Sequence, residues 1–305
     1  MDELPKGDHM ADLGQPLVQF NRVTLTVEGR TFFQDLDLTV YHGESLVIGG
    51  PPGCGKSFVP RLILGLPGIG RAKVELDGEV IVAGQSVFSD MQPVELQKLR
   101  RQMGSILRGG ALIENMDIRS NITLPINYHY RDILGPKEFD ARCDKLLDDM
   151  AMSGLATLGR RPVSLNQEER LYVSLARALI NEPFLLLLDE PMAGLSPKSA
   201  QRLAQFLFHY EPEFSESDEL HSSSHQLLTR VATTVDFFGY LSHATRFVVL
   251  RNQKMEVIGD KIDVGISKEP FVRELLTTFD DGFGSEFSST NAGYQRHGRA
   301  TETSG

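Results

Sequence analysis

The residues with the clearest chemistry form the segment GPPGCGKS, which has the pattern G-x-x-x-x-G-K-S. Its glycines let the backbone fold tightly, with N–H groups that point inward around a phosphate chain. The lysine of this pattern reaches the β- and γ-phosphates of a nucleotide, and the hydroxyl of the following serine binds Mg²⁺. The sequence therefore predicts a loop for the phosphates of Mg·ATP, made of Gly50, Pro51, Pro52, Gly53, Cys54, Gly55, Lys56, Ser57 and Phe58.

Two residues in and after this loop are irregular. Pro60 lies early in the helix expected over residues 56–66, where it removes a backbone donor and is expected to bend the helix. Cys54 would stand near the N-terminus of that helix, a position that lowers the pKa of a thiol. A redox switch at Cys54 is one interpretation; a small residue that simply fits the loop is the favoured one.

A second group of candidate residues ends a run of leucines. The segment FLLLLDEP spans residues 184–191, and its apolar part is typical of a strand buried on both faces of a mostly parallel sheet. Asp189 at the end of that strand is placed to hold Mg²⁺ together with Ser57, and Glu190 to polarise the attacking water. The alternative, a surface Asp-Glu pair that caps the next helix, is disfavoured by the matching phosphate loop.

The elements that must position these residues follow from apolar periodicity. The short apolar run 45–50 leads into the phosphate loop as a strand. Further strands are predicted over 17–27, 31–40, 230–236 and 246–252, and a hairpin over 74–84 with its turn at Asp77-Gly78. Helices are predicted over 93–102, 137–158, 168–181, 199–208 and 270–279.

Composition limits the classes of function. The net charge of −10 argues against a nucleic-acid partner, because phosphates require a basic face. No apolar run approaches the roughly 20 residues that span a bilayer, so any membrane role is expected to depend on a partner. The acidic, polar N-terminus resembles neither a signal nor a transit peptide. Cys54 and Cys143 are the only cysteines and form no CxxC pair, which suits a reducing compartment and excludes a cysteine-based zinc site.

With both motifs and the segment LARAL before the leucine run, the chain resembles ABC-type ATPase subunits over residues 17–265. The resemblance implies an α/β fold with a mostly parallel core sheet, an antiparallel β subdomain and a helical subdomain. The segments at 100–126 and 270–282 also look like the ATPases of Mla/Mce-type phospholipid transporters. Those proteins act beneath an integral-membrane permease, which implies a homo- or heterodimer with a second ATPase subunit, a lipid substrate handled indirectly and a place on the cytoplasmic face of the bacterial inner membrane.

The sequence departs from this family at the signature that faces the partner's nucleotide. Aligned through Leu175–Ala178, the LSGGQ pentapeptide falls on Leu165–Glu169, so Gln167 and Glu168 replace two glycines. Asn166 can replace the serine as a helix cap. We expect the added side chains and the charge of Glu168 to weaken closure on a phosphate.

Other family positions also differ. The glutamine after the strand in ILRGG is Arg108, the histidine that senses the γ-phosphate falls on Val235, and the aspartate of the next loop becomes Ser196. His225 is a weak substitute for the histidine, because it lies ten positions too early. For adenine stacking, Val27 falls near the expected place, and Phe20 and Phe32 are close in sequence.

Since the lost groups serve both composite sites, we expect Mg·ATP binding with slow or partner-dependent hydrolysis. The main hypothesis is a transporter ATPase subunit. The alternatives are a nucleotide-locked regulatory or structural subunit of a membrane assembly and, least favoured, a non-transport protein that acts on nucleic acid.

The expected domain organisation has three parts. A flexible lead (1–15) precedes an ATP-binding domain (16–266), whose helical subdomain covers about 93–180. A C-terminal helix and a disordered tail (267–305) follow. Phe271, Leu275, Leu276 and Phe279 recur at helical spacing, so the helix either contacts a neighbouring subunit or packs on its own domain.

Overall fold

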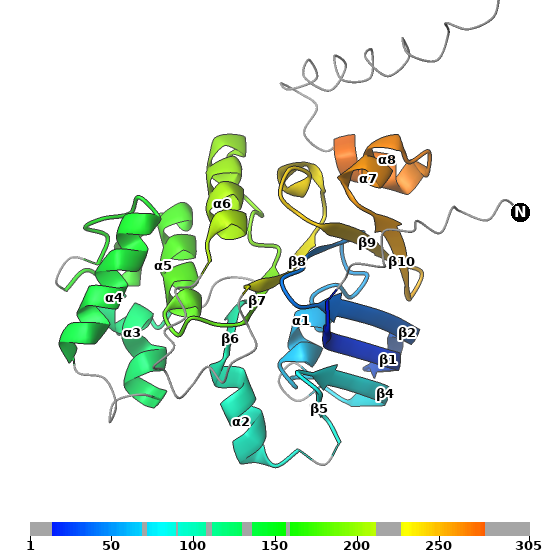
Figure 1. Cartoon of the computed structure of the whole chain (residues 1–305), viewed down its shortest axis with the longest axis horizontal. Helices are drawn as coiled ribbons and strands as arrows, with labels where there is room; N and C mark the ends of the chain where they lie inside the picture. Colours follow the sequence, from blue (N-terminus) through cyan, green and yellow to red (C-terminus); the bar gives the residue numbers. More distant parts are fainter. Residues whose placement is uncertain are drawn as a thin grey trace, which may run out of the picture.

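The computed structural model describes residues 14–68, 72–89, 91–107, 112–129, 136–156, 159–211 and 227–277. Two sheets and their covering helices make up this part of the chain (Figure 1). The expected flexible lead, apart from residues 14 and 15, and the expected C-terminal tail from residue 278 onward lie outside the described residues. No helix within the described ranges is long and apolar enough to cross a membrane.

The smaller sheet is antiparallel and has the strand order β2-β1-β4-β5. Its strands are β1 (Pro16–Val27), β2 (Arg30–Tyr41), β4 (Val74–Val82) and β5 (Gln85–Ser86). β1 and β2 alternate apolar inward and polar outward residues, as expected of strands with one buried face. The sheet packs against the short helix α1 (Phe58–Ile63) that follows the phosphate loop.

The larger sheet has the order β10-β9-β3-β8-β7-β6 and carries the candidate site. All neighbouring strands in it are parallel except β10, which is antiparallel to β9. The strands are β3 (Ser45–Gly49), β6 (Met103–Ile106), β7 (Leu185–Asp189), β8 (Thr229–Thr234), β9 (Arg246–Arg251) and β10 (Lys254–Gly259). β3 and β7 are buried throughout, which explains their uninterrupted hydrophobicity.

Helices cover one face of this sheet, and the antiparallel sheet with α1 and α2 (Pro93–Arg101) covers the other. The strands divide their side chains between the two cores: Leu186 and Leu188 face the helices, while Leu185 and Leu187 face the antiparallel sheet. The helices are α2 (Pro93–Arg101), α3 (Ile118–His129), α4 (Pro136–Asp149), α5 (Gln167–Leu179), α6 (Pro197–His209), α7 (Lys261–Ile266) and α8 (Pro270–Thr277). α3, α4 and α5 pack on one another at the side of the molecule away from the antiparallel sheet (Figure 1).

The prediction of a hairpin turn at Asp77-Gly78 is wrong. β4 runs through both residues and pairs with β1, and the chain reverses at Ala83-Gly84 instead. The irregularity is on β1, where the pairing shifts between Asn21 and Thr24. Gly78 lies opposite this bulge, and a Cβ there would come within 2.3 Å of the Arg22 carbonyl oxygen.

The sequence analysis also missed elements. α3 was not predicted, because Pro125 interrupts its pattern, although Ile118, Ile122 and Ile126 recur every fourth residue and are fully buried. β10 and α7 were also missed. The helix predicted over 137–158 ends at Asp149, followed by Ala151 at φ 56°.

The C-terminal helix α8 packs on its own domain. Val272 and Leu275 belong to the core cluster on the helical face of the large sheet, and Phe271 and Leu276 pack against that cluster. The backbone N–H of Phe237 donates to the carbonyl of Leu275 at 2.8 Å. Phe279, the fourth apolar residue considered for a contact with a neighbouring subunit, lies outside the described residues.

Candidate functional site

The phosphate loop connects β3 to α1 at the carboxyl edge of the large sheet. Lys56 is only 3% exposed, and its Nζ donates to the carbonyls of Gly50 at 2.9 Å and Pro51 at 3.1 Å. The same nitrogen lies 3.7 Å from Oε1 of Glu190. The ammonium group is therefore held inside the loop by oxygen ligands, a place where phosphate oxygens can take over as partners.

The two residues predicted to hold Mg²⁺ touch each other. The Ser57 hydroxyl donates to Oδ1 of Asp189 at 2.9 Å, although the two residues come from different strand ends. A hydroxyl and a carboxylate are oxygen ligands of the kind that Mg²⁺ prefers. Within the described residues, no cluster of three or more His, Cys, Asp or Glu side chains offers a metal site of another kind. The donor set thus fits Mg²⁺, with substrate phosphates and water as the remaining ligands.

Thr233 is a member of this site that the sequence analysis did not find. β8 lies between β3 and β7, and Thr233 pairs in register with Asp189. Its hydroxyl donates to Oδ1 of Asp189 at 2.6 Å and accepts from the backbone N–H of Glu190 at 3.1 Å. The available signal was the pair of threonines that ends β8.

Glu190, the residue after Asp189, has a strained backbone. Its φ of 49° lies in the left-handed region, which residues other than glycine seldom adopt. The backbone N–H of Glu190 is also held by the carbonyl of Thr233 at 3.1 Å. Positive φ at a non-glycine residue is common in functional sites, and here it turns the carboxylate toward Lys56.

Glycine is required at two positions of the loop. A Cβ on Gly50 would lie 2.5 Å from the carbonyl oxygen of Leu250, and one on Gly55 would lie 2.9 Å from the ring of Phe32. Gly55 also has φ +106°, which a side chain would strain.

The structure corrects both expectations about irregular residues near the loop. Pro60 is the third residue of α1, where a backbone N–H has no acceptor within the helix, so the proline removes no bond. The pKa of Cys54 is raised, because burial of the thiol outweighs the lowering effect of Lys56. Cys54 is therefore a protonated thiol at neutral pH and not an activated one.

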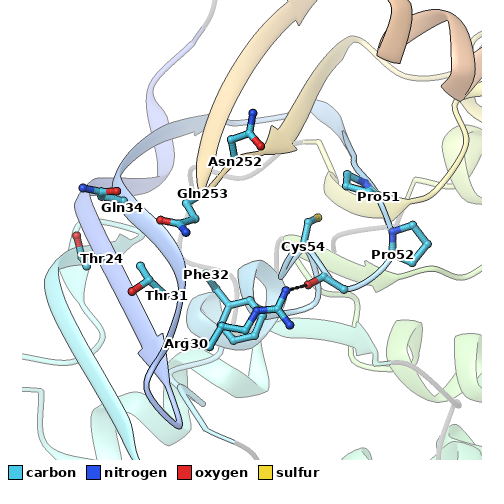
Figure 2. A pocket seen from close by; sticks show the side chains of 11 residues that line it. Thr24, Arg30, Thr31, Phe32, Gln34, Pro51, Pro52, Cys54, Asn252 and Gln253 are labelled. Atoms are coloured by element: carbon cyan, nitrogen blue, oxygen red, sulfur yellow. Dashed lines mark hydrogen bonds between the residues drawn. The ribbon is translucent and has the colours of Figure 1, made fainter.

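A hollow of about 620 Å³ opens beside the phosphate loop. Figure 2 shows it between β2, the loop and the β9–β10 turn. Its lining residues are Thr24, Arg30, Thr31, Phe32, Gln34, Pro51, Pro52, Gly53, Cys54, Asn252 and Gln253. Of the aromatic residues considered for adenine, Phe32 lines the hollow, whereas Phe20 is 1% exposed and belongs to the core.

The comparisons with known proteins agree with this geometry. A family model described as "ABC transporter" matches residues 33–193, more than half of the chain. The chain belongs to this family. Its fold is that of an ABC cassette, as the sequence analysis expected.

Several curated ABC relatives are spermidine/putrescine import ATP-binding proteins named PotA. The protein of Vibrio cholerae is 25% identical over 87% of this chain and 62% of its own length. The protein of Shigella flexneri is 29% identical over 91% of this chain and 64% of its own length. The chain thus spans less than two thirds of the length of these relatives.

Solved structures share the fold. The dimeric bacterial ABC transporter cassette MJ0796 superimposes with a TM-score of 0.64 at 23% identity, over 79% of this chain and 97% of its own. CbiO1 from Clostridium perfringens, described as part of the ABC transporter complex cbiONQ, gives a TM-score of 0.65 at 19% identity, over 84% of this chain and 92% of its own.

The segment on which we expect the ABC signature to fall is a regular helix start. Asn166 caps α5: its side chain accepts from the backbone N–H of Glu169 at 2.9 Å, and the Glu169 carboxylate accepts from the N–H of Asn166 at 2.9 Å. This reciprocal pair is a capping box. The expected role of Asn166 as a helix cap is confirmed.

Gln167 and Glu168 are bound to the segment that follows Glu190. Gln167 Nε2 donates to the carbonyl of Ala193 at 3.1 Å. Oε2 of Glu168 accepts from the Ser199 hydroxyl at 2.7 Å, and its Oε1 lies 3.9 Å from Arg202. The charge of Glu168 therefore has a partner within its own subunit, which the sequence analysis did not foresee.

The remaining ABC positions lie as follows. Ser196 caps α6 by accepting from the N–H of Ser199 at 3.2 Å. Val235, at the place of the histidine, is 38% exposed just beyond β8. Arg108 and His225 lie outside the described residues.

Proposed function

We propose that this chain is the Mg·ATP-binding subunit of an ABC transporter and that it hydrolyses ATP slowly or only with a partner. The observation that carries the proposal is the convergence of Lys56 and Ser57 from one segment, and of Asp189 and Glu190 from another, onto one edge of the sheet. Each of these residues has the type that phosphoryl transfer from Mg·ATP requires.

The roles follow from the contacts. Lys56 exchanges its backbone carbonyl partners for the β- and γ-phosphates. Ser57 and Asp189 would hold Mg²⁺ through their oxygen atoms, and Thr233 keeps Asp189 oriented. Glu190 orients the attacking water and accepts its proton as general base. Mg²⁺, when bound, neutralises the charge that develops on the phosphate oxygens.

The hollow beside the loop is the proposed place of the base and ribose. It adjoins Gly53 and Cys54, so a nucleotide whose phosphates occupy the loop extends into it. Phe32 supplies the only aromatic ring among its lining residues. Val27 does not line it, so the aromatic surface comes from β2 and not from the end of β1.

Slow hydrolysis is inferred from the groups that meet a partner's nucleotide. Gln167 and Glu168 occupy positions where glycine backbone approaches the γ-phosphate in this family, and Val235 offers no hydrogen bond. Each lost transition-state contact costs about 10²–10³ in rate. A partner subunit with an intact signature would restore one of the two composite sites.

For the assembly we propose a homo- or heterodimer of ATPase subunits beneath an integral-membrane permease, on the cytoplasmic face of the bacterial inner membrane. The cargo proposed from the segments at 100–126 and 270–282 is phospholipid. A second candidate, polyamine import, is favoured by the names of the curated relatives. Cargo-stimulated ATPase of the chain with its co-purified permease, in nanodiscs with phospholipid as cargo or with added spermidine, would separate the two.

The deciding experiment measures Mg·ATP binding and phosphate release of the purified chain beside Glu190→Gln, alone and with its co-purified membrane partner. We expect micromolar binding in both variants and slow release that Glu190→Gln abolishes. Tight binding without any Glu190-dependent release, in either condition, would instead identify the alternative function, a nucleotide-locked regulatory subunit. Lys56→Ala is the control that removes binding, and binding that survives it would contradict the proposed site.

A further inference from the structure

Arg30 holds two contacts at once beside the phosphate loop. Its guanidinium carbon lies 4.7 Å from the centroid of the Phe32 ring, and its Nη2 donates to the carbonyl of Gly53 at 2.9 Å. Arg30 begins β2, and Figure 2 shows it beside Phe32 with the hydrogen bond to the loop. The arginine thus connects the aromatic wall of the hollow to the backbone that surrounds the phosphates.

The ring of Phe32 is already covered by other groups. The ring of Phe58 packs on it with centroids 4.8 Å apart, and the backbone of Gly55 is so close that a Cβ would collide with the ring. Arg30 lies over the ring from the side of the hollow (Figure 2). A nucleobase would have to displace the guanidinium to stack directly on Phe32, and this would also break the bond to Gly53.

We propose that Arg30, backed by Phe32, is the surface on which the base of the bound nucleotide stacks. A guanidinium group is planar and stacks on π-systems, and every base has a π-face. The inference rests on the proposed nucleotide site and goes beyond it, because it assigns the stacking surface to a cation in a chain whose expected aromatic position is Val27. Through Gly53, the same group links an occupied base site to the phosphate loop.

The wall of the hollow opposite Arg30 is the β9–β10 turn, and its position is fixed. Asn252 and Gln253 form the tight β9–β10 turn, with φ of 51° and 66°. The carbonyl of Gln253 accepts from the backbone N–H of Gln34 on β2 at 3.0 Å, which ties the turn to the strand that carries Arg30. The width of the hollow is therefore set by backbone bonds, and Arg30 is the wall that can adjust to the ligand.

The test compares a ligand with a base and one without. Titration calorimetry on the full chain would measure the Kd of Mg·ATP and of Mg·tripolyphosphate for the wild type and for Arg30→Lys. Lysine keeps the charge and a donor for Gly53 but loses the plane. We expect Arg30→Lys to weaken ATP binding roughly tenfold, the order of one stacking contact, and to leave tripolyphosphate binding unchanged.

The control is Arg22→Lys, the same change at an exposed arginine on β1 that does not line the hollow; neither ligand should be affected. An equal loss for both ligands in Arg30→Lys, at an unchanged thermal midpoint, would show that Arg30 only shapes the loop and would overturn the inference. Unchanged ATP binding would overturn it too. Failure of the wild type to bind either ligand would instead refute the proposed nucleotide site itself. If Arg30→Lys lowers the thermal midpoint, Arg30→Gln replaces it under the same criteria.

Discussion

At the scale of single residues, the site depends on a threonine that has no part in the recognised motifs. Thr233 bonds to both residues at the end of the leucine strand. Its hydroxyl donates to the Asp189 side chain and accepts from the backbone N–H of Glu190. Such outer contacts orient metal ligands and typically account for 10–100-fold in metal affinity. The orientation of Asp189, the proposed Mg²⁺ ligand, is therefore set from the neighbouring strand.

Thr233→Val should weaken Mg·ATP binding about tenfold while leaving ATP binding in EDTA unchanged, because only the metal ligand loses its support. Calorimetry in the two conditions checks this. Thr234→Val is the matched control, since the hydroxyl of Thr234 donates to the carbonyl of Asp236 instead. Equal effects of the two variants would contradict the role given to Thr233.

Cys54 offers a prediction about pH. Burial raises the pKa of its thiol, so the reactive thiolate is scarce at neutral pH and forms only as the pH rises toward the raised pKa. Alkylation of Cys54 by iodoacetamide should be slow at pH 7, speed up with pH beyond the range of an ordinary thiol, and be blocked by Mg·ATP. Burial raises the pKa of Cys143 to about 11 and shields it, so Cys54→Ser should show almost no labelling. Rapid labelling of Cys54 at pH 6–7 would contradict a raised thiol pKa.

At the scale of elements, the helix starts around the site are fastened to one another. The first turn of α5 contacts the segment from Ala193 to Arg202 through Gln167 and Glu168. This segment begins three residues after Glu190. The expected signature segment is therefore in direct contact with the loop that follows the candidate base, within one subunit.

Restoring glycine in this helix start should not repair the ATPase. Glu168→Gly removes the acceptor of the Ser199 hydroxyl and adds a helical glycine, so we expect a loss of about 1–3 kcal/mol in unfolding free energy and no increase in phosphate release. Glu168→Gln keeps an acceptor and removes the charge. A rise in phosphate release with Glu168→Gln would show that the charge, and not the side-chain bulk, limits hydrolysis.

The C-terminal helix is a second case of coupling between elements. Leu275 is 3% exposed, and a Cβ on Gly49 would lie 3.0 Å from its Cδ1, so α8 packs directly behind the last residue of β3. Leu275→Ala should lower the unfolding free energy by about 2–4 kcal/mol. Denaturant titration checks this against Arg273→Ala on the exposed side of the helix, which should stay within about 0.5 kcal/mol of the wild type. Similar values for both variants would mean that α8 is not part of the core.

At the scale of the whole molecule, each composite site of the proposed dimer would lack groups that a complete ABC site has. The groups that we propose hold Mg·ATP within one subunit are present, whereas the positions expected to face a partner's γ-phosphate carry Gln167, Glu168 and Val235. We therefore expect Glu190→Gln, which cannot hydrolyse ATP, to stay monomeric in Mg·ATP. Light scattering at micromolar concentration checks the molar mass, with Lys56→Ala as the variant that cannot bind. A stable ATP-dependent homodimer of Glu190→Gln would contradict the proposed weak closure.

The sequence by itself determined the phosphate loop, the ends of β3 and β7 and the family. Local patterns carry these features: the loop requires glycine and lysine at fixed spacing, and strands buried on both faces need uninterrupted apolar runs. Only the tertiary structure decided that Thr233 bonds to Asp189, that Glu168 turns to Arg202, that Phe32 lines the hollow while Phe20 does not, and that β4 runs straight through Asp77-Gly78. In each case the residue that makes the contact is far away in sequence. It lies on the neighbouring strand, on the next helix or at the bulge of β1. Strand order and register bring those partners together, and no local pattern encodes them.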